Sequence, residues 1–563
     1  MEMGTEDGVT ELDAVWRALK PWGKFQSFQL FLILLDFIPA SFAILSAVFT
    51  GYIPEYVCDV PTAVNNATSD LGNVSFTQHQ CSYDVYANEG NTSKILESRS
   101  CESYSFTNEN SYAYQWNLVC SRSNLAALAQ SLVLAGQGLG ALIMSHLADR
   151  FGRKTVHVIS HVGVFCSMIV MAFSQNIYML LALRLITGTF QQGIVCTGKT
   201  LALEIFPREA RAHTAPAGFI TWGMGLMILS LYGFVFQDIN WRYLQLAIAA
   251  FSLYALAEWW MMDESVRWLL SNGRLDEAKR ILKKAARWNK VDYKEVESVL
   301  NESVNLTATE TPEANLHEKE MKILTNGSMN HDEMESDMTI QTVKKYTVID
   351  ILKNPSLRVN TFILWYTWIV ATGTYYGLTL VSSHLAGDRF INFFLSGVIE
   401  IPSQVISFCL LNRIGRKWTM ILWYAISGIS LIIATVLLTV FEDNEVAGIV
   451  ATAFSLIGKS AITGSFSIVF LYTPEIYPTN YRNSGLGISS SISRIGGILA
   501  PFVSNLALIA LWIPGAIFGG MCLLVVLLAL RLPESATHEL PTTIAECETW
   551  ENNKNSDNKN KLL

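Results

Sequence analysis

The chain has 563 residues, of which 51% are hydrophobic and only 16% are charged, and its formal net charge is −8. An ordinary multidomain soluble protein has far more charged surface, so this composition excludes that class and makes a soluble enzyme untenable. Most of the chain must therefore have a lipid bilayer as its solvent.

Twelve stretches are long and apolar enough to cross a bilayer, whose hydrocarbon core of about 30 Å requires about 20 helical residues. They lack the alternation of polar residues that a barrel strand shows, which favours helices. In chain order they cover 25–50, 124–148, 155–174, 177–200, 213–236, 241–262, 357–381, 389–411, 416–440, 446–473, 483–506 and 507–531. We therefore predict an all-α polytopic membrane protein with twelve transmembrane helices.

Three short features occur once in each half of the chain, with nearly the same offset between their copies. DRFGRK at 149–154 is matched by NRIGRK at 412–417. In the same way, an Arg follows a Glu by seven positions in each half, and a Glu-Ser pair closes each half (Glu204, Arg211, Glu264 and Ser265; Glu475, Arg482, Glu534 and Ser535). Such internal repeats are typical of transporters whose substrate site lies between two equivalent halves. We predict six-helix bundles at 25–262 and 357–531.

Basic residues in the short loops predict the orientation of the helices, because such loops face the cytosol. These residues are Arg150, Arg153, Lys154, Arg208, Arg211, Arg413, Arg416 and Lys417. The N-terminus (1–24), the central loop (263–356) and the tail (532–563) are then cytosolic, and the loop 51–123 is extracellular. Residues 1–24 lack the apolar core of a cleavable signal, so we expect the first span to act as an uncleaved anchor.

The two large loops have different compositions. The outer loop carries glycosylation sequons at Asn66, Asn73 and Asn91. It also contains four cysteines, which predict two disulfides in any of three pairings (Cys58, Cys81, Cys101 and Cys120). In the central loop, 264–288 alternates acidic and basic residues and predicts an amphipathic helix pair near the lipid headgroups. Residues 301–340 are polar and aperiodic, and we expect a disordered linker there.

Several longer strings narrow the assignment. They are WNLVC at 116–120, ESVRWLL at 264–270, FFLSGVIEIP at 393–402 and YTPEIYPTNYRN at 472–483. With these strings the chain resembles solute carrier family 22, the organic ion transporters of the major facilitator superfamily. The resemblance implies the twelve-helix fold of that superfamily and a small organic ion as substrate. Asn412 departs from the family pattern, because an Asp is common at that position of the repeat.

The resemblance also implies a cytoplasmic gate made of charged residues at helix ends. Its members would be Asp149, Arg150, Arg153, Glu204 and Arg211 in the first half, and Arg413, Arg416, Glu475 and Arg482 in the second. The alternative is that the basic residues only set the topology. The acidic residues favour the gate, since topology does not require them.

Ionisable residues inside spans are costly, by about 2.5–3.5 kcal/mol at the helix centre, so each requires a partner or a function. Counting from the span ends places Asp36, Glu400, Lys459 and Arg494 near mid-depth. Glu400 and Lys459 are either substrate ligands or a permanent ion pair. Asp36 either binds a cationic end of the substrate or has a structural role.

Arg494 is the most informative of the four, because a guanidinium stays charged and can bind a carboxylate through two hydrogen bonds. In the family, this position is usually basic in anion and carnitine-type members and acidic in mammalian polyspecific cation members. Aromatic candidates for the apolar or ammonium part of a substrate are Trp222, Tyr232, Tyr375 and Tyr376. Packing or lipid contact is the alternative for each of them. Lys199 is explained by snorkelling to the cytosolic surface.

The sequence therefore predicts a plasma-membrane carrier of small organic ions with both termini in the cytosol, leaning towards carboxylate-bearing zwitterions or organic anions. Polyspecific cation transport is the first alternative, and a non-transporting receptor-like glycoprotein is the second. No Walker sequence, metal-ligand spacing or nucleophile elbow is apparent. We accordingly expect no enzymatic activity, no cofactor, no metal and no nucleic-acid partner.

Overall fold

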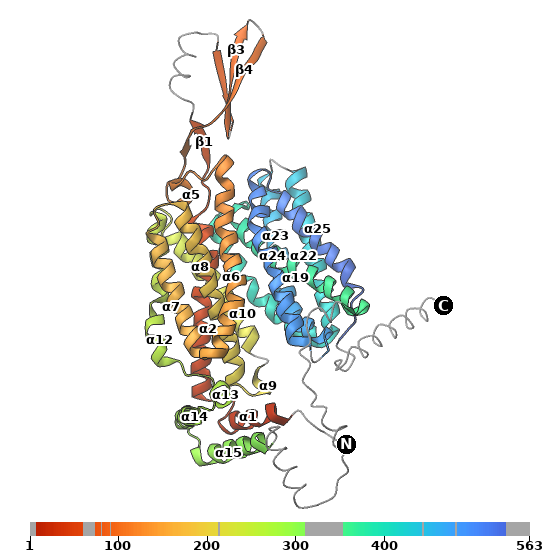
Figure 1. Ribbon diagram of the computed structural model, residues 1–563. Helices are drawn as coiled ribbons and strands as arrows, with labels where there is room; N and C mark the ends of the chain where they lie inside the picture. Colours follow the sequence, from red (N-terminus) through yellow and green to blue (C-terminus); the bar gives the residue numbers. More distant parts are fainter. Residues whose placement is uncertain are drawn as a thin grey trace, which may run out of the picture.

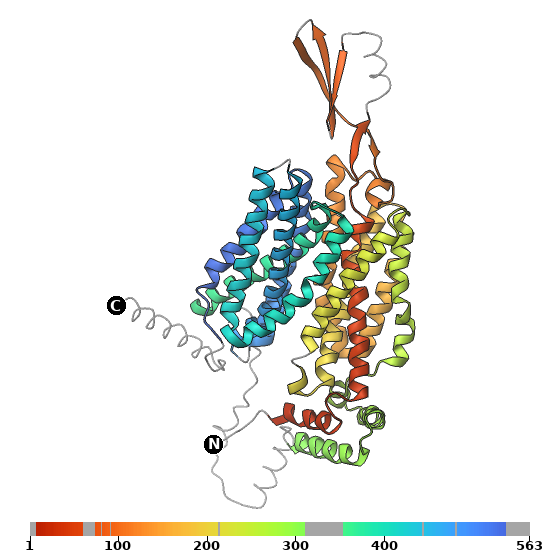
Figure 2. The same ribbon diagram turned by 180° about the vertical axis from the view of Figure 1, so that it is seen from behind.

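The computed structural model describes residues 7–59, 74–79, 81–89, 92–211, 214–309, 353–441, 444–478 and 481–535. The N-terminal and C-terminal halves of the chain form two helical bundles that stand side by side (Figure 1). The view from behind shows the same separation of the two halves (Figure 2).

The first bundle contains six spans. The first is α2 (Lys24–Leu45) with its short continuation α3 (Ala47–Thr50), and the last is α11 (Trp241–Phe251) followed, after a 3-10 turn, by α12 (Ala255–Met261). Between them lie α6 (Ser123–Phe151), α7 (Arg153–Ala172), α8 (Ile177–Ile205) and α10 (Thr214–Val235). A single turn, α9 (Arg208–Arg211), precedes α10.

The second bundle repeats this pattern with α19 (Pro355–Val381), α20 (Arg389–Val398) continued by α21 (Glu400–Ile414), α22 (Arg416–Val440), α23 (Glu445–Ile476), α24 (Arg482–Asn505) and α25 (Ile513–Ala529). The predicted fold class is confirmed. The last span begins later than the predicted residue 507, because Pro514 lies in its first turn and a proline without an N–H group favours a helix start.

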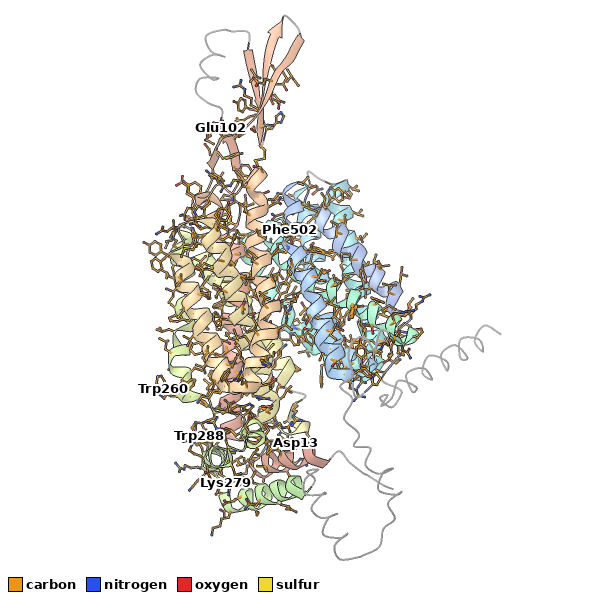
Figure 3. All side chains as sticks on the ribbon, in the orientation of Figure 1. Asp13, Glu102, Trp260, Lys279, Trp288 and Phe502 are labelled. Carbon is orange, nitrogen blue, oxygen red and sulfur yellow. A yellow bond between two sulfur atoms is a disulfide. The ribbon has the colours of Figure 1, made fainter. Side chains whose placement is uncertain are left out.

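The outer faces of the bundles suit a lipid environment. Ten described helices are long and apolar enough to cross a membrane, and α25 is a shorter apolar helix. Large apolar side chains such as Leu142, Tyr178 and Leu527 are more than half exposed. Trp260, at 77% exposure, points away from the bundle at the end of α12 (Figure 3). Outside a bilayer these surfaces would be unfavourable, so they mark the lipid-facing sides.

Short strands project beyond one end of the first bundle, which we call the strand end (Figure 1). β1 (Tyr56–Asp59) pairs with β5 (Ser103–Phe106), and β3 (Ser82–Glu89) pairs with β2 (Val74–Gln78) and β4 (Thr92–Ser100), all antiparallel. The structure selects one of the three disulfide pairings, Cys58 with Cys101 and Cys81 with Cys120. The sequons at Asn66, Asn73 and Asn91 lie outside the described residues.

At the opposite end, four helices form a layer beneath the first bundle (Figure 1). They are α1 (Asp7–Ala18), α13 (Val266–Ser271), α14 (Leu275–Asn289) and α15 (Tyr293–Thr309). The repeated motifs lie at this end of the bundles, so we call it the motif end.

Two expectations about the central loop differ from the structure. The apolar face of α14 does not lie on lipid, because Leu282 and Ala285 pack with Val15 of α1 and Leu300 of α15 in a separate buried core. The predicted linker at 301–340 begins too early, since α15 continues to Thr309. Residues 310–352 lie outside the described part of the chain.

Candidate substrate site and gate

The two bundles are in contact at the strand end. The ring of Phe49 stacks on that of Phe390 with centroids 5.4 Å apart, and meets Phe393 edge-on at 5.0 Å. The Ser230 hydroxyl donates a 2.6 Å hydrogen bond to the carbonyl of Phe390. These contacts form an apolar seam that joins the halves at this end.

Two glycines bring α10 and α20 into backbone contact nearer the middle of the bundles. A Cβ atom on Gly223 would lie 3.1 Å from the carbonyl oxygen of Gly397, and one on Gly397 would lie 2.9 Å from that of Gly223. On the other side of the interface, Ser131 of α6 donates a 2.7 Å hydrogen bond to the carbonyl of Ile498 on α24. Each of these contacts thus joins a helix of the first half to a helix of the second half.

Arg494 lies at this interface, halfway along α24. Its Nη1 donates to Oε1 of Gln137 on α6 at 2.7 Å, and its Nη2 donates to Oε1 of Gln192 on α8 at 3.3 Å. The Gln137 amide in turn donates to Gln191 at 2.8 Å. No carboxylate of the described residues lies within 4.0 Å of this guanidinium, which is only partly buried. Its charge is solvated by neutral amides and is free for an anionic partner.

Two further side chains accompany Arg494. Tyr376 of α19 is buried beside Gln137 and Arg494. Lys199 of α8 is exposed, its Nζ lies 5.0 Å from the ring centroid of Phe470 on α23, and it lies within electrostatic reach of Arg494. Snorkelling therefore does not describe Lys199, because its ammonium group turns towards the other half. The interface carries two cations on opposite bundles.

Glu400 and Lys459 form a separate, closed set. Lys459 Nζ lies 3.4 Å from Glu400 Oε1 and donates to the Ser396 hydroxyl at 2.7 Å. The Tyr375 hydroxyl donates to Glu400 at 2.8 Å, and the indole of Trp222, from the first half, donates to Tyr375 at 2.8 Å. Both charges are almost fully buried and each compensates the other.

The remaining predicted substrate residues do not join these sets. Tyr232 packs against Phe42 and stacks on Phe236 within the first half. Asp36 is fully buried inside the first bundle, where His157 and Tyr254 are its hydrogen-bond partners. A substrate role for Asp36 receives no support from these contacts, since every partner belongs to the same bundle.

The predicted gate residues form equivalent contacts in the two halves. Arg153 lies 3.1 Å from Asp149 and 3.6 Å from Glu204, and Arg416 lies 3.4 Å from Glu475. Glu264 accepts the backbone N–H of Lys154, and Glu534 accepts that of Arg416, both at 3.0 Å. A carboxylate beside a helix N-terminus is favourable, so the repeated Glu-Ser pairs have a physical role at the start of α7 and α22.

The other basic residues of the predicted gate behave differently. Arg211 pairs with Asp13 of α1 at 2.6 Å rather than with Glu204. Arg482 donates to the carbonyl of Tyr477 at 3.3 Å. Arg150 lies over the ring of Phe151, and Arg413 is exposed. Among the described gate residues, each ion pair stays within its own half.

Comparisons with known proteins agree with this architecture. The family of sugar and other transporters matches residues 73–542. The organic cation transporter protein of Drosophila melanogaster is 32% identical, over 97% of this chain and 95% of its own length. The human organic cation/carnitine transporter 2 is 29% identical over 95% and 94%, and solute carrier family 22 member 21 of Mus musculus is 28% identical over 96% and 93%. The chain is a member of solute carrier family 22.

Solved structures support the fold of this solute carrier. The partially occluded inward open conformation of the xylose transporter XylE from E. coli matches with a TM-score of 0.58 and 14% sequence identity, covering 92% of this chain and all of that one. At that identity the likeness establishes the fold alone. Together with the family match it places the chain among multi-pass membrane transporters of the major facilitator superfamily, which are not enzymes.

The candidate site of this solute carrier contains polar residues that were not among those predicted from the sequence. Gln137, Gln191 and Gln192 all lie within apolar spans. A buried amide is costly unless it is hydrogen-bonded, so three glutamines in two apolar helices are themselves a signal of a polar site. The sequence prediction considered only ionisable and aromatic side chains inside the spans, so it did not include these glutamines.

Reversing one charge of the predicted gate in this solute carrier should slow transport. In Glu475→Arg, a second cation would face Arg416 in place of the ion pair, and we expect turnover to fall roughly three- to tenfold at equal surface expression. Initial uptake rates normalised to surface-labelled protein measure this effect. The double variant Arg416→Glu/Glu475→Arg, which restores an ion pair with the charges exchanged, should recover part of the uptake rate. Glu445→Arg changes an exposed residue of the same helix and should leave the uptake rate at the wild-type value. Wild-type turnover in Glu475→Arg would remove this residue from the gate.

Proposed function

We propose that the chain transports small organic ions bearing a carboxylate, including zwitterions of the carnitine kind, across the plasma membrane. The observation that carries this proposal is the guanidinium of Arg494 at the interface, hydrogen-bonded to Gln137 and Gln192 and facing no described carboxylate within ion-pair distance. The termini and residues 263–356 face the cytosol, and residues 51–123 face outwards.

A substrate carboxylate would take the place of the glutamine oxygens on Arg494. Neutral amides are weaker acceptors than a carboxylate, and a guanidinium binds a carboxylate through two parallel hydrogen bonds. Lys199 adds a second positive charge from the opposite bundle. A ligand bound here touches both halves, which is the requirement for coupling its binding to their movement.

The aromatic residues next to Arg494 suit the rest of such a solute. Tyr376 lies beside the guanidinium, and the rings of Tyr375 and Tyr376 are 5.3 Å apart. Ring faces attract quaternary ammonium groups, so a zwitterion would place its carboxylate on Arg494 and its cationic end towards the Tyr375–Glu400 side. This arrangement favours a zwitterion over a simple cation.

Alternating access would arise from rocking of the two bundles about the interface. The apolar seam closes the strand end, whereas the described ion pairs at the motif end remain within each half. In the opposite state, the seam would open and the charged helix ends would meet across the halves. The repeat supports this proposal because equivalent contacts exist on both sides of the interface.

Organic cation transport is the second candidate. It is favoured by Glu400 with Trp222 and Tyr375, and by the name of the Drosophila relative. However, Glu400 is already neutralised by Lys459, whereas Arg494 has no such partner among the described residues. A cation would therefore have to displace an internal ion pair.

A comparison of two probes that differ only in the carboxylate tests the proposal. Radiolabelled L-carnitine and its methyl ester share the quaternary ammonium group, but the ester has lost the negative charge. In cells with verified surface expression, we expect carnitine to enter above the vector-only level, with unlabelled carnitine and a dicarboxylate inhibiting its uptake and the ester inhibiting poorly. Uptake of the ester and of simple cations without carnitine uptake would establish the second candidate. The absence of flux for all organic ions would favour a receptor-like glycoprotein.

A further inference from the structure

Four ionisable side chains that this transport proposal does not use meet inside the first bundle. They are Asp36 of α2, His157 and His161 of α7, and Glu258 of α12, and all four are fully buried. His157 Nε2 lies 2.8 Å from Asp36 and 3.4 Å from Glu258. His161 Nδ1 lies 2.7 Å from Glu258 and 3.4 Å from Asp36. Two imidazole nitrogens and two carboxylates thus face one another.

The neighbouring hydrogen bonds determine which nitrogen of His157 carries a proton. The Thr197 hydroxyl donates its only hydrogen to the carbonyl of Gly193 at 2.6 Å, so it accepts from Nδ1–H of His157 at 2.8 Å. In the neutral ring, Nε2 then presents a lone pair to Asp36 and Glu258. A lone pair that faces carboxylate oxygens is repelled by them, so the centre of the cluster requires positive charge, supplied either by a second proton on the imidazoles or by a bound cation.

A second observation favours a bound cation over protons. Glu258 Oε1 is buried and has no hydrogen-bond partner in the described part of the chain, although it faces into the cluster. An unsatisfied carboxylate oxygen inside a membrane protein is strongly unfavourable. Bonding to a metal ion would satisfy this oxygen and the His157 lone pair at once.

The ligand set and its supporting contacts suit a zinc-type ion. His157 and His161 are four residues apart on one helix, which places both rings on the same face. Two imidazoles and two carboxylates are common zinc ligands, and a divalent ion balances the two negative charges. Thr197 holds the His157 tautomer, and the Tyr254 hydroxyl donates to Asp36 at 2.8 Å, as outer partners of metal ligands do.

We propose that Asp36, His157, His161 and Glu258 bind one divalent transition-metal ion of the zinc class. In a tetrahedral site with bonds of about 2.0–2.1 Å, neighbouring ligand atoms lie about 3.3 Å apart. One ligand atom each of Asp36, His161 and Glu258 already lies within 4.8 Å of the other two, and His157 adjoins this group at 2.8 Å from Asp36. The ion joins α2, α7 and α12 and makes the first bundle stiffer. Its role is structural and independent of the substrate proposed above.

Metal content of the full-length protein tests the site directly. The chain would be purified in detergent from cells supplied with zinc, dialysed against metal-free buffer and analysed by plasma mass spectrometry. We expect about one zinc ion per chain in wild type and a loss of at least about tenfold in His161→Gln and Glu258→Gln. His146→Gln, at an exposed histidine of α6, should retain the wild-type content.

Two further measurements use the wild-type chain alone, so they do not depend on the folding of any variant. A membrane-permeant chelator should lower the thermal unfolding temperature, and zinc should restore it. Protein expressed with cobalt should show the visible absorption of tetrahedral cobalt. Wild-type protein without stoichiometric metal, stabilised instead by protons on the same four groups, would overturn the proposal. Metal bound equally well by His161→Gln would also overturn it.

Discussion

Replacing Arg494 by Asp is expected to reduce uptake of carboxylate-bearing solutes by roughly 30- to 1000-fold. The change removes two charge-assisted hydrogen bonds and adds a negative charge that repels a carboxylate, together about 2–4 kcal/mol. Gln137 and Gln192 would lose their donor, but Gln137 would keep its hydrogen bond to Gln191. We therefore expect the variant to fold and reach the cell surface. Initial uptake of carnitine, normalised to surface protein, measures the effect.

Three companion measurements make the Arg494 result specific. Arg494→Lys keeps the charge without the planar fork and should retain partial uptake. Arg358→Gln removes an exposed arginine of α19 and should behave as wild type. Cationic solutes without a carboxylate should enter the Arg494→Asp variant at least as well as the wild type. Unchanged carnitine uptake in this variant would rule out Arg494 as the carboxylate ligand.

Replacing Lys459 by Met should destabilise the folded protein more than either Arg494→Asp or Glu475→Arg. The side chains of Lys459 and Glu400 are 1% and 3% exposed, so removal of the cation leaves an uncompensated carboxylate inside the second bundle. Breaking a buried pair from one side typically costs about 3–5 kcal/mol, which is comparable with a large part of a domain's stability. We expect low surface expression and a markedly lower unfolding temperature in detergent.

The double variant Glu400→Gln/Lys459→Met separates a structural role from a substrate role. With both charges removed, Gln can still accept a hydrogen bond from Tyr375, and stability should return close to the wild-type value. Normal carnitine uptake by this stable double variant would assign the pair a structural role alone. Lost uptake at normal expression would place the pair in contact with the solute. Failure of the double variant to recover stability would contradict the ion-pair explanation.

The predicted gate residues illustrate how far a local repeat can predict contacts. Arg153 with Glu204 and Arg416 with Glu475 occupy equivalent positions in the two bundles, as the repeated motifs predicted. Arg211 does not follow the pattern, because α1 supplies Asp13 as a partner, and no repeated motif pointed to a helix in that segment. Its partner belongs to a distant segment of chain, and such a contact has no local signal.

Length, apolar composition and internal repetition by themselves determined the membrane class, the twelve spans and the equivalence of the halves. The reason is that desolvation of a backbone or a charge in lipid is so costly that it constrains every span locally. Only the tertiary structure decided which polar groups share a site. It separated Asp36 from Arg494, turned Lys199 towards the other bundle and brought His157 and His161 to two distant carboxylates. Those placements depend on helix packing between segments far apart in the chain, which hydropathy does not encode.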